Sequence, residues 1–318
     1  MANELNLVYR WALKWSRLGI LVTLALVWAF NLTGNEINLS IQLAIALIAL
    51  LVGIPHGAID HLIAIPSDPK SRFIAYIAIY VLVAVFAGFI ISTWNLYGFR
   101  AILLMSALHF GFGDASYLNE SRDSLSQKRE NLFTEVMYAI PAGFLPVFLP
   151  ITDSRTASAL KRIHPELINW GSGFEQTIRI SIIVITALSL LIFLVQRKID
   201  LVIDLFLLAA ISFFTPPLIA FATYFGFWHA LRHTARLVPK LDKANQFAVS
   251  GNWKKAIIGA VTPGLYAVVG TLLLASILMY VWPHKFASSL LWSTLLLIWS
   301  LTVPHMITTA RFDLKVIR

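Results

Sequence analysis

Hydrophobic and polar positions follow one pattern along the whole chain: long apolar runs are separated by short polar segments that hold most of the charge. A helix needs roughly 20 predominantly apolar residues to cross a bilayer, and runs of about that length recur from end to end. The pattern therefore predicts an all-α, polytopic transmembrane bundle of about eight to ten spans. The expected spans lie at 17–33, 39–65, 73–94, 100–118, 132–151, 178–195, 200–214, 218–236, 256–282 and 288–309.

Proline residues mark the two least regular places in this layout. The run at 132–151 holds three prolines, which makes it the least secure span. The "TPP" at 215–217 divides a longer apolar stretch, because a prolyl pair removes two backbone donors and disfavours helix just before it. We expect a tight extracytoplasmic turn there. No repeat or soluble domain is visible, so residues 1–318 are expected to form a single integral membrane domain.

The composition supports a membrane protein. Hydrophobic residues make up 58% of the 318 positions and charged residues only 13%, which is about half the charged share of a typical soluble domain. The first apolar run is not followed by a small-residue cleavage site, so it is interpreted as a retained span. A multi-pass protein of the cell's inner (cytoplasmic) membrane is the expected result.

The distribution of positive charge predicts the orientation in that membrane. With a cytoplasmic N-terminus, nineteen of the 25 Lys and Arg residues fall on the inner side of the expected layout. Inner loops are enriched in these residues, so both termini are predicted to be cytoplasmic. The net charge of +9 is thereby explained by orientation, and nucleic-acid binding is excluded as the reason for it.

Histidines gather at one depth of the predicted bundle. The chain has no cysteine, so a metal ion would have to be held by nitrogen or oxygen ligands. Ionisable groups inside a membrane are costly, face the bundle interior and mark function by default. Two histidines, His164 and His284, fall in outer loops as ordinary exposed side chains. The other six lie near the cytoplasmic ends of four spans: His56, His61, His109, His229, His233 and His305.

Each histidine motif also has an ordinary structural explanation. In "WHALRH", His229 and His233 are four residues apart and share one helical face, as two ligands of one metal would. They could equally hydrogen-bond to neighbouring helices near the interface. His109 taken alone could be a satisfied core histidine. His305, in "VPHM", is predicted to have a structural role or to support the ligands from beside them.

The stretch "GIPHGAIDH" at 53–61 interrupts an apolar run with two imidazoles and a carboxylate. On one continuous helix His56 and Asp60 share a face, whereas His61 points about 140° away from His56. Pro55 is expected to kink the helix toward the bundle axis. Asp60 is then placed to accept a hydrogen bond from an imidazole ring, which fixes the tautomer of a metal ligand.

Three ordered motifs resemble those of a known family. "PHGAIDH", "HFGFGD" and "YFGFWHALRH" are similar to the histidine motifs of the Brp/Blh membrane carotene dioxygenases. The resemblance implies cleavage of β-carotene at its central double bond by O2 and non-haem Fe(II), giving two molecules of retinal. It also implies that the four iron ligands are His56, His109, His229 and His233, with no catalytic residue beyond them.

Two further groups of residues are expected around these ligands. Four side chains are predicted to support the ligands: Asp60, His61, Asp114 and His305. Aromatic residues next to the ligands could line a tunnel for a long apolar substrate, although aromatic residues are common near membrane interfaces in any case. The tunnel candidates are Phe110, Phe112, Tyr224, Phe225, Phe227 and Trp228. The expected partners are β-carotene, O2 and membrane lipid, and the resemblance implies a functional link to a microbial rhodopsin that uses the retinal.

Other classes of protein remain as alternatives. Membrane desaturases and hydroxylases use paired histidine boxes, and no two histidines are adjacent in this sequence. Another membrane non-haem iron enzyme acting on carotenoids or lipids, a b-haem electron carrier, or a transporter with a His/Asp proton relay would each place histidines inside the bundle. A haem band in the visible spectrum would identify the carrier, and intact carotene would identify the transporter.

Overall fold

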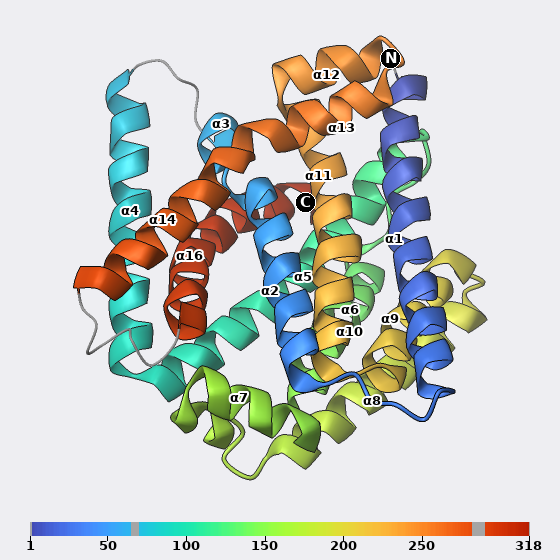
Figure 1. Cartoon of the computed structure of the whole chain (residues 1–318). Helices are drawn as coiled ribbons and strands as arrows, with labels where there is room; N and C mark the ends of the chain where they lie inside the picture. Colours follow the sequence, from blue (N-terminus) through green and yellow to red (C-terminus); the bar gives the residue numbers. More distant parts are fainter. Residues whose placement is uncertain (1, 65–69, 282–289, 318) are drawn as a thin grey trace.

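A computed structural model describes residues 2–64, 70–281 and 290–317, and every regular element within these ranges is helical (Figure 1). The prediction of an all-helical bundle is confirmed. The α-helices are α1 Ala2–Asn31, α2 Leu39–Gly57, α3 Asp60–Ala64, α4 Lys70–Thr93, α5 Asn95–Ser124, α6 Leu132–Ile151, α7 Ala157–Ile163, α8 Glu175–Val195, α9 Ile199–Phe214, α10 Pro217–Thr223, α11 Ala230–Leu237, α12 Asp242–Val249, α13 Trp253–Val261, α14 Leu265–Val281 and α16 Leu290–Ile317.

Short helical turns join several of these helices. Four are 3₁₀ turns, and the fifth is a π-helical segment that leads into α11. The 3₁₀ turns are η1 Ser154–Thr156, η2 Pro165–Asn169, η4 Val238–Lys240 and η5 Thr262–Gly264, and the π-helical segment is η3 Tyr224–His229.

Eight helical segments in the described residues are long and apolar enough to cross a membrane. Many of their large apolar side chains face outward, such as Leu26, Trp28 and Phe86, each more than 60% exposed. A water-soluble protein would not leave so much apolar surface uncovered. These eight segments are Leu5–Asn31, Leu39–Ile63, Lys70–Thr93, Asn95–Ser124, Leu132–Ile151, Glu175–Val195, Trp253–Val281 and Leu291–Asp313.

The two remaining expected spans are helical as well, but they lie largely inside the bundle. Helix α9 has 16 residues, and the chain then turns at Thr215 and Pro216 and returns through α10, η3 and α11. The predicted break at "TPP" is therefore present. The proline-rich run at 132–151 forms one continuous helix, α6, whose first turn is capped by the side chain of Asn131.

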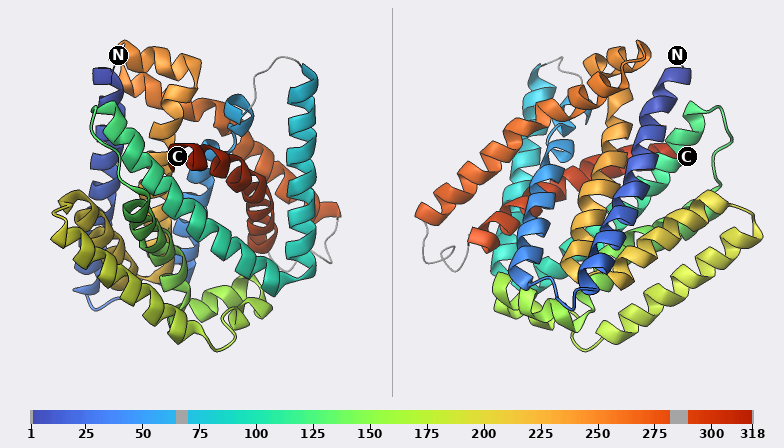
Figure 2. Two further views of the ribbon diagram at one scale, coloured as in Figure 1. Left: turned by 180° about the vertical axis from the view of Figure 1, so that it is seen from behind. Right: turned by 45° about the vertical axis from the view of Figure 1, so that its right-hand side comes forward.

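Glycines bring α5 and α6 into direct backbone contact. A Cβ atom on Gly111 would overlap the carbonyl oxygen of Ala139, and one on Gly143 would overlap that of Ala107. Small residues permit this approach between membrane helices. The left view of Figure 2 shows α5 crossing the bundle obliquely. The contact fixes the depth of the α5 segment that carries "HFGFGD".

Side-chain contacts connect four segments that were predicted to be cytoplasmic. Figure 1 shows the N-terminus beside α12 and α13 at one end of the bundle and the C-terminus nearer its middle. At the start of α1, Tyr9 accepts a hydrogen bond from Tyr117, near the end of α5, through its backbone carbonyl. Arg236, just before the 237–255 loop, forms ion pairs with Glu120 and with Asp313 of α16. These contacts connect the start of α1, the end of α5, the end of α11 and the end of α16, and the charge pattern predicts that all four are cytoplasmic.

A buried ion-pair cluster ties α11 to its neighbours. Asp204 of α9 contacts Arg232 of α11 at 2.9 Å and Arg17 of α1 at 2.7 Å. Arg232 is 1% exposed and lies over the ring of Trp228 at 3.6 Å. Buried charges require such pairing, so this cluster holds the segment from η3 to α11 in position.

Candidate metal centre

Five histidines from four parts of the chain meet in the interior of the bundle. His56 lies in the last turn of α2, His109 in α5, His229 and His233 in the η3–α11 segment, and His305 in α16. None of the five is more than 8% exposed. The four histidines expected as ligands are thus brought together, and His305 joins them.

The rings are in mutual contact. Ring centroids of eight pairs among the five lie 5.0–6.2 Å apart, the shortest separation being that of His56 and His233. Two imidazoles on one metal ion have centroids roughly 4.5 Å apart when their bonds meet at a right angle and roughly 5.3 Å apart at a tetrahedral angle, given metal–nitrogen bonds of about 2.1 Å. No three donor side chains in the described ranges already meet as an ion-binding group. The longer separations, up to the 6.2 Å between His109 and His233, would have to shorten for all five rings to bind one ion.

The donor chemistry fits a metal ion. Buried nitrogens without a hydrogen-bond partner include Nδ1 of His56, Nε2 of His109, His229 and His305, and both nitrogens of His233. A buried polar atom without a partner is costly, and a metal ion would satisfy several of these nitrogens at once. Imidazole ligands suit zinc, copper, iron and nickel. The five side chains therefore fit a transition-metal ion.

Irregular backbone places two of these rings. Pro55 cannot donate to the preceding turn, and α2 ends at Gly57 instead of continuing to 65 as predicted. The expected shared helical face of His56 and Asp60 is therefore wrong, because Asp60 begins the separate helix α3. His229 ends the π-helical segment η3, and such bulges in α-helices are frequent at functional sites.

Hydrogen bonds orient two of the rings. Asp60 accepts from Nδ1 of His305 at 2.9 Å, and the Tyr80 hydroxyl donates to the same carboxylate at 3.3 Å. Nδ1 of His109 lies 3.2 Å from the hydroxyl of Thr309. Asp60 thus contacts an imidazole, as expected, but the ring belongs to α16. The repeated Pro-His pair of "VPHM" was the sequence signal for His305.

Two of the expected supporting residues lie outside the group of five rings. Asp114 accepts from the indole nitrogen of Trp228 at 2.7 Å and from the hydroxyl of Tyr224 at 3.4 Å. It supports η3 through these two side chains, because both belong to that segment. His61 packs against Phe73, with ring centroids 6.2 Å apart, and is absent from the eight close pairs.

The outer-loop histidines are outside the cluster. His164 ends α7 and packs against Trp292, with ring centroids 4.9 Å apart, so it is half-buried and not freely exposed as predicted. His284 lies outside the described residues.

Two adjoining cavities open beside the histidines. The first, which we call the metal-side cavity, has a volume of about 240 Å³ and is lined by His56, His109 and His305. The second, the apolar cavity, has a volume of about 160 Å³ and extends between α2, α5, α6 and α16. The residues that line both are Leu50, Phe110, Phe225, Ile298 and Thr302.

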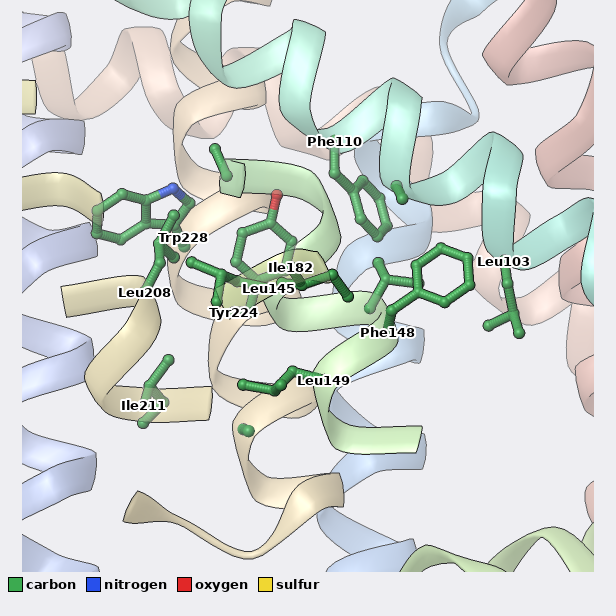
Figure 3. Close-up of a cluster of buried hydrophobic side chains, with 14 of the residues drawn as sticks. Leu103, Phe110, Leu145, Phe148, Leu149, Ile182, Leu208, Ile211, Tyr224 and Trp228 are labelled. Atoms are coloured by element: carbon green, nitrogen blue, oxygen red, sulfur yellow. The ribbon is translucent and has the colours of Figure 1, made fainter. Parts of the chain in front are cut away.

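The six aromatic tunnel candidates divide between the cavities and other positions. Phe110 and Phe225 line both cavities. Tyr224 and Trp228 are fully buried and point toward Asp114, on the side of the core away from Leu103 (Figure 3). Phe112 packs against the main core cluster. Phe227 is 53% exposed and lies against Gly19 of α1.

The fold and the site define a class: a membrane-type helical bundle with a buried cluster of imidazoles suited to a metal ion. The sequence profile of the β-carotene 15,15'-dioxygenase family matches residues 46–313, a segment that contains all five clustered histidines. The chain belongs to this family. It is also 26% identical over 275 residues to a β-carotene 15,15'-dioxygenase from uncultured marine bacterium 66A03, covering 83% of this chain and 90% of that protein. No solved structure matches the chain.

Proposed function

We propose that the protein uses non-haem Fe(II) to cleave β-carotene at its central double bond with O2, giving two molecules of all-trans-retinal. The observation that carries the proposal is the buried set of unpaired imidazole nitrogens at the wall of the metal-side cavity. Family membership supports carotenoid cleavage as the type of reaction. Each O2 supplies one oxygen atom to each aldehyde, so no other oxidant or reductant is required.

The residues that would hold the iron are His56, His109, His229 and His233. Neutral imidazoles leave the ion its full positive charge, and the bound iron would supply activation of O2 toward the electron-rich polyene. The protein's own contribution is to keep the rings neutral and unpaired by burying them, and to exclude water from the space beside them.

The cavities suggest how a long apolar substrate would be oriented. Phe110 and Phe225 line both the metal-side cavity and the apolar cavity, so the two cavities adjoin. A rod-like molecule that occupied both would pass directly beside the histidines. Such positioning of one double bond against the reactive centre is the main means by which a protein can select a cleavage position. The substrate would enter from the lipid, in which it dissolves.

The proposal extends to location and partners. Both termini are proposed to be cytoplasmic, in the inner membrane of the cell, with residues 1–318 acting as one integral membrane domain. Retinal released into the bilayer would be available to a microbial rhodopsin, which is the functional link that the family implies. Family membership does not favour the alternatives, namely another non-haem iron oxidoreductase of lipids or carotenoids and a proton-coupled transporter.

Expression in a bacterium that accumulates β-carotene tests the function. Chromatography of the pigments should show loss of β-carotene and appearance of about two retinals for each carotene lost, only in the presence of air. Cells expressing His109→Ala provide the matched control and should stay orange. Unequal apocarotenals would contradict central cleavage, and hydroxylated or desaturated carotenoids with an intact carbon chain would contradict the dioxygenase.

A further inference from the structure

The contacts among the five histidine rings have a definite geometry. Of the ten pairs that five rings can form, the eight close pairs leave out only His56 with His109 and His229 with His305. These eight contacts are the edges of a square pyramid. His233 is at the apex, because its ring is close to all four others. In the base, His56 lies opposite His109, and His229 lies opposite His305. Five donors placed in this way match a six-coordinate ion with one position open.

The open position of this pyramid would face the metal-side cavity. The apex residue, His233, does not line that cavity, whereas three of the four base residues do: His56, His109 and His305. The cavity therefore lies on the side of the base opposite the apex. This is the side on which a sixth ligand would have room.

His305 has the hydrogen bonds of a metal ligand. Its Nδ1 is held by both carboxylate oxygens of Asp60, at 2.9 and 3.1 Å, and its Nε2 is buried without a partner. A carboxylate that accepts from the far nitrogen of a ligating histidine fixes its tautomer and increases its basicity. His109 has the same arrangement, with Thr309 at Nδ1 and an unpaired Nε2.

Gly57 makes room for this ring. A Cβ atom at Gly57 would lie 3.3 Å from Cγ and Nδ1 of His305, which is tighter than an ordinary contact. Nε2 of His305 has no hydrogen-bond partner among the described residues, and the rings of His56, His109 and His233 are its close neighbours.

We infer that His305 is a fifth imidazole ligand of the metal and that Asp60, supported by Tyr80, positions its ring. The inference rests on the proposed metal-dependent function and extends its ligand set beyond the four histidines of the family motifs. In this arrangement His305 binds the metal directly, and Asp60 is the residue that supports a ligand from beside it.

Cobalt(II) binding to the full-length protein in detergent tests the inference without any measurement of activity. The visible absorption of cobalt(II) is weak in five- or six-coordinate sites and strong in four-coordinate sites. Wild-type protein should give the weak spectrum. His305→Ala should give the stronger four-coordinate spectrum and roughly 10- to 100-fold weaker binding, with Asp60→Asn weaker by about 10-fold and its weak spectrum kept.

Two further variants separate ligation from a structural role. His305→Gly should recover the wild-type spectrum when free imidazole is added, because the imidazole can occupy the vacated space. His164→Ala, a histidine outside the cluster, should match wild type throughout. An unchanged spectrum and affinity in His305→Ala, or no response of His305→Gly to imidazole, would overturn the inference while leaving the proposed function intact. Wild-type protein that binds neither cobalt nor iron would overturn both.

Discussion

At the scale of single residues, the unusual feature is a group of polar side chains whose potential to form hydrogen bonds is not used. Interior polar groups are normally paired, because each unpaired donor or acceptor costs about 1–3 kcal/mol. Five imidazoles with unpaired nitrogens in one place therefore reduce stability unless something else satisfies them. In enzymes such costs are concentrated at functional sites, and here a metal ion is the group that would remove them.

Removing one ring should remove the metal. His109→Ala or His229→Ala is expected to lower the iron content of the purified protein from about one per chain to background, because each variant removes one of the four histidines proposed to hold the iron. Elemental analysis of protein purified after growth in iron-rich medium provides the measurement. His164→Ala is the control and should retain wild-type iron. Zinc in place of iron in the wild type would point to a different metal.

At the scale of helices, two kinds of contact hold the site together. Backbone contact at Gly111 and Gly143 sets α5 against α6, and the ion pairs of Asp204 set α9 against α1 and α11. Helices α5 and α11 carry His109 and His233, and His229 directly precedes α11. The stability of these contacts is therefore a condition for the geometry of the site.

Substitution at the α5–α6 contact should be destabilising. Gly111→Ala adds a methyl group where the carbonyl of Ala139 lies, so the helices must separate, and we expect a lower thermal midpoint in detergent and loss of bound metal. Gly270→Ala in α14 is the matched control, because no atom lies within 4 Å of its added Cβ. That variant should be neutral or slightly more stable, since alanine favours helix over glycine. Equal effects of the two substitutions would contradict the close contact.

Breaking the buried ion-pair cluster should also be costly. Asp204→Ala leaves Arg232 buried without its carboxylate, and removal of one partner of a buried pair costs about 3–5 kcal/mol. Thermal unfolding in detergent should show a midpoint lower by several degrees. Asp200→Ala is the control on the same helix, because its side chain is 74% exposed and its contact with Arg17 is long, at 3.5 Å. A similar loss in both variants would show that the cluster is not responsible.

At the scale of the whole molecule, the chain combines an apolar exterior with one polar end. The N-terminus, the 119–131 and 237–255 loops and the end of α16 meet at that end, through Tyr9, Glu120, Arg236 and Asp313. Because these four segments are in contact, we expect them to lie on the same side of the membrane. The excess of Lys and Arg there favours the cytoplasmic side.

Reporter fusions test this orientation. Fusions at the C-terminus and within the 237–255 loop should be active only with a cytoplasmic reporter, and a fusion in the 152–177 segment only with a periplasmic one. The expected result follows from nineteen basic residues on the inner side against six on the outer side. A C-terminus and a 237–255 loop on opposite sides would contradict the fold itself, whereas both in the periplasm would contradict only the orientation.

The sequence by itself determined the helical membrane architecture and the histidines that meet inside it. Both follow from local properties: the length of apolar runs sets the spans, and the cost of polar groups in lipid directs His56, His109, His229 and His233 inward. The order of the three histidine motifs also indicated the family of carotene dioxygenases. Even the break at Thr215 followed locally from the two prolines after it.

Only the tertiary structure decided which side chains are partners. Asp60 and His305 are separated by 245 positions, and Trp228 and Asp114 by 114, so no local spacing relates them. The early end of α2 at Gly57, which freed Asp60 to reach α16, likewise depends on how neighbouring helices pack around the bend at Pro55. Side chains that extend from different helices meet according to helix depth and rotation, and these are set by packing over the whole bundle, because no short segment contains that information.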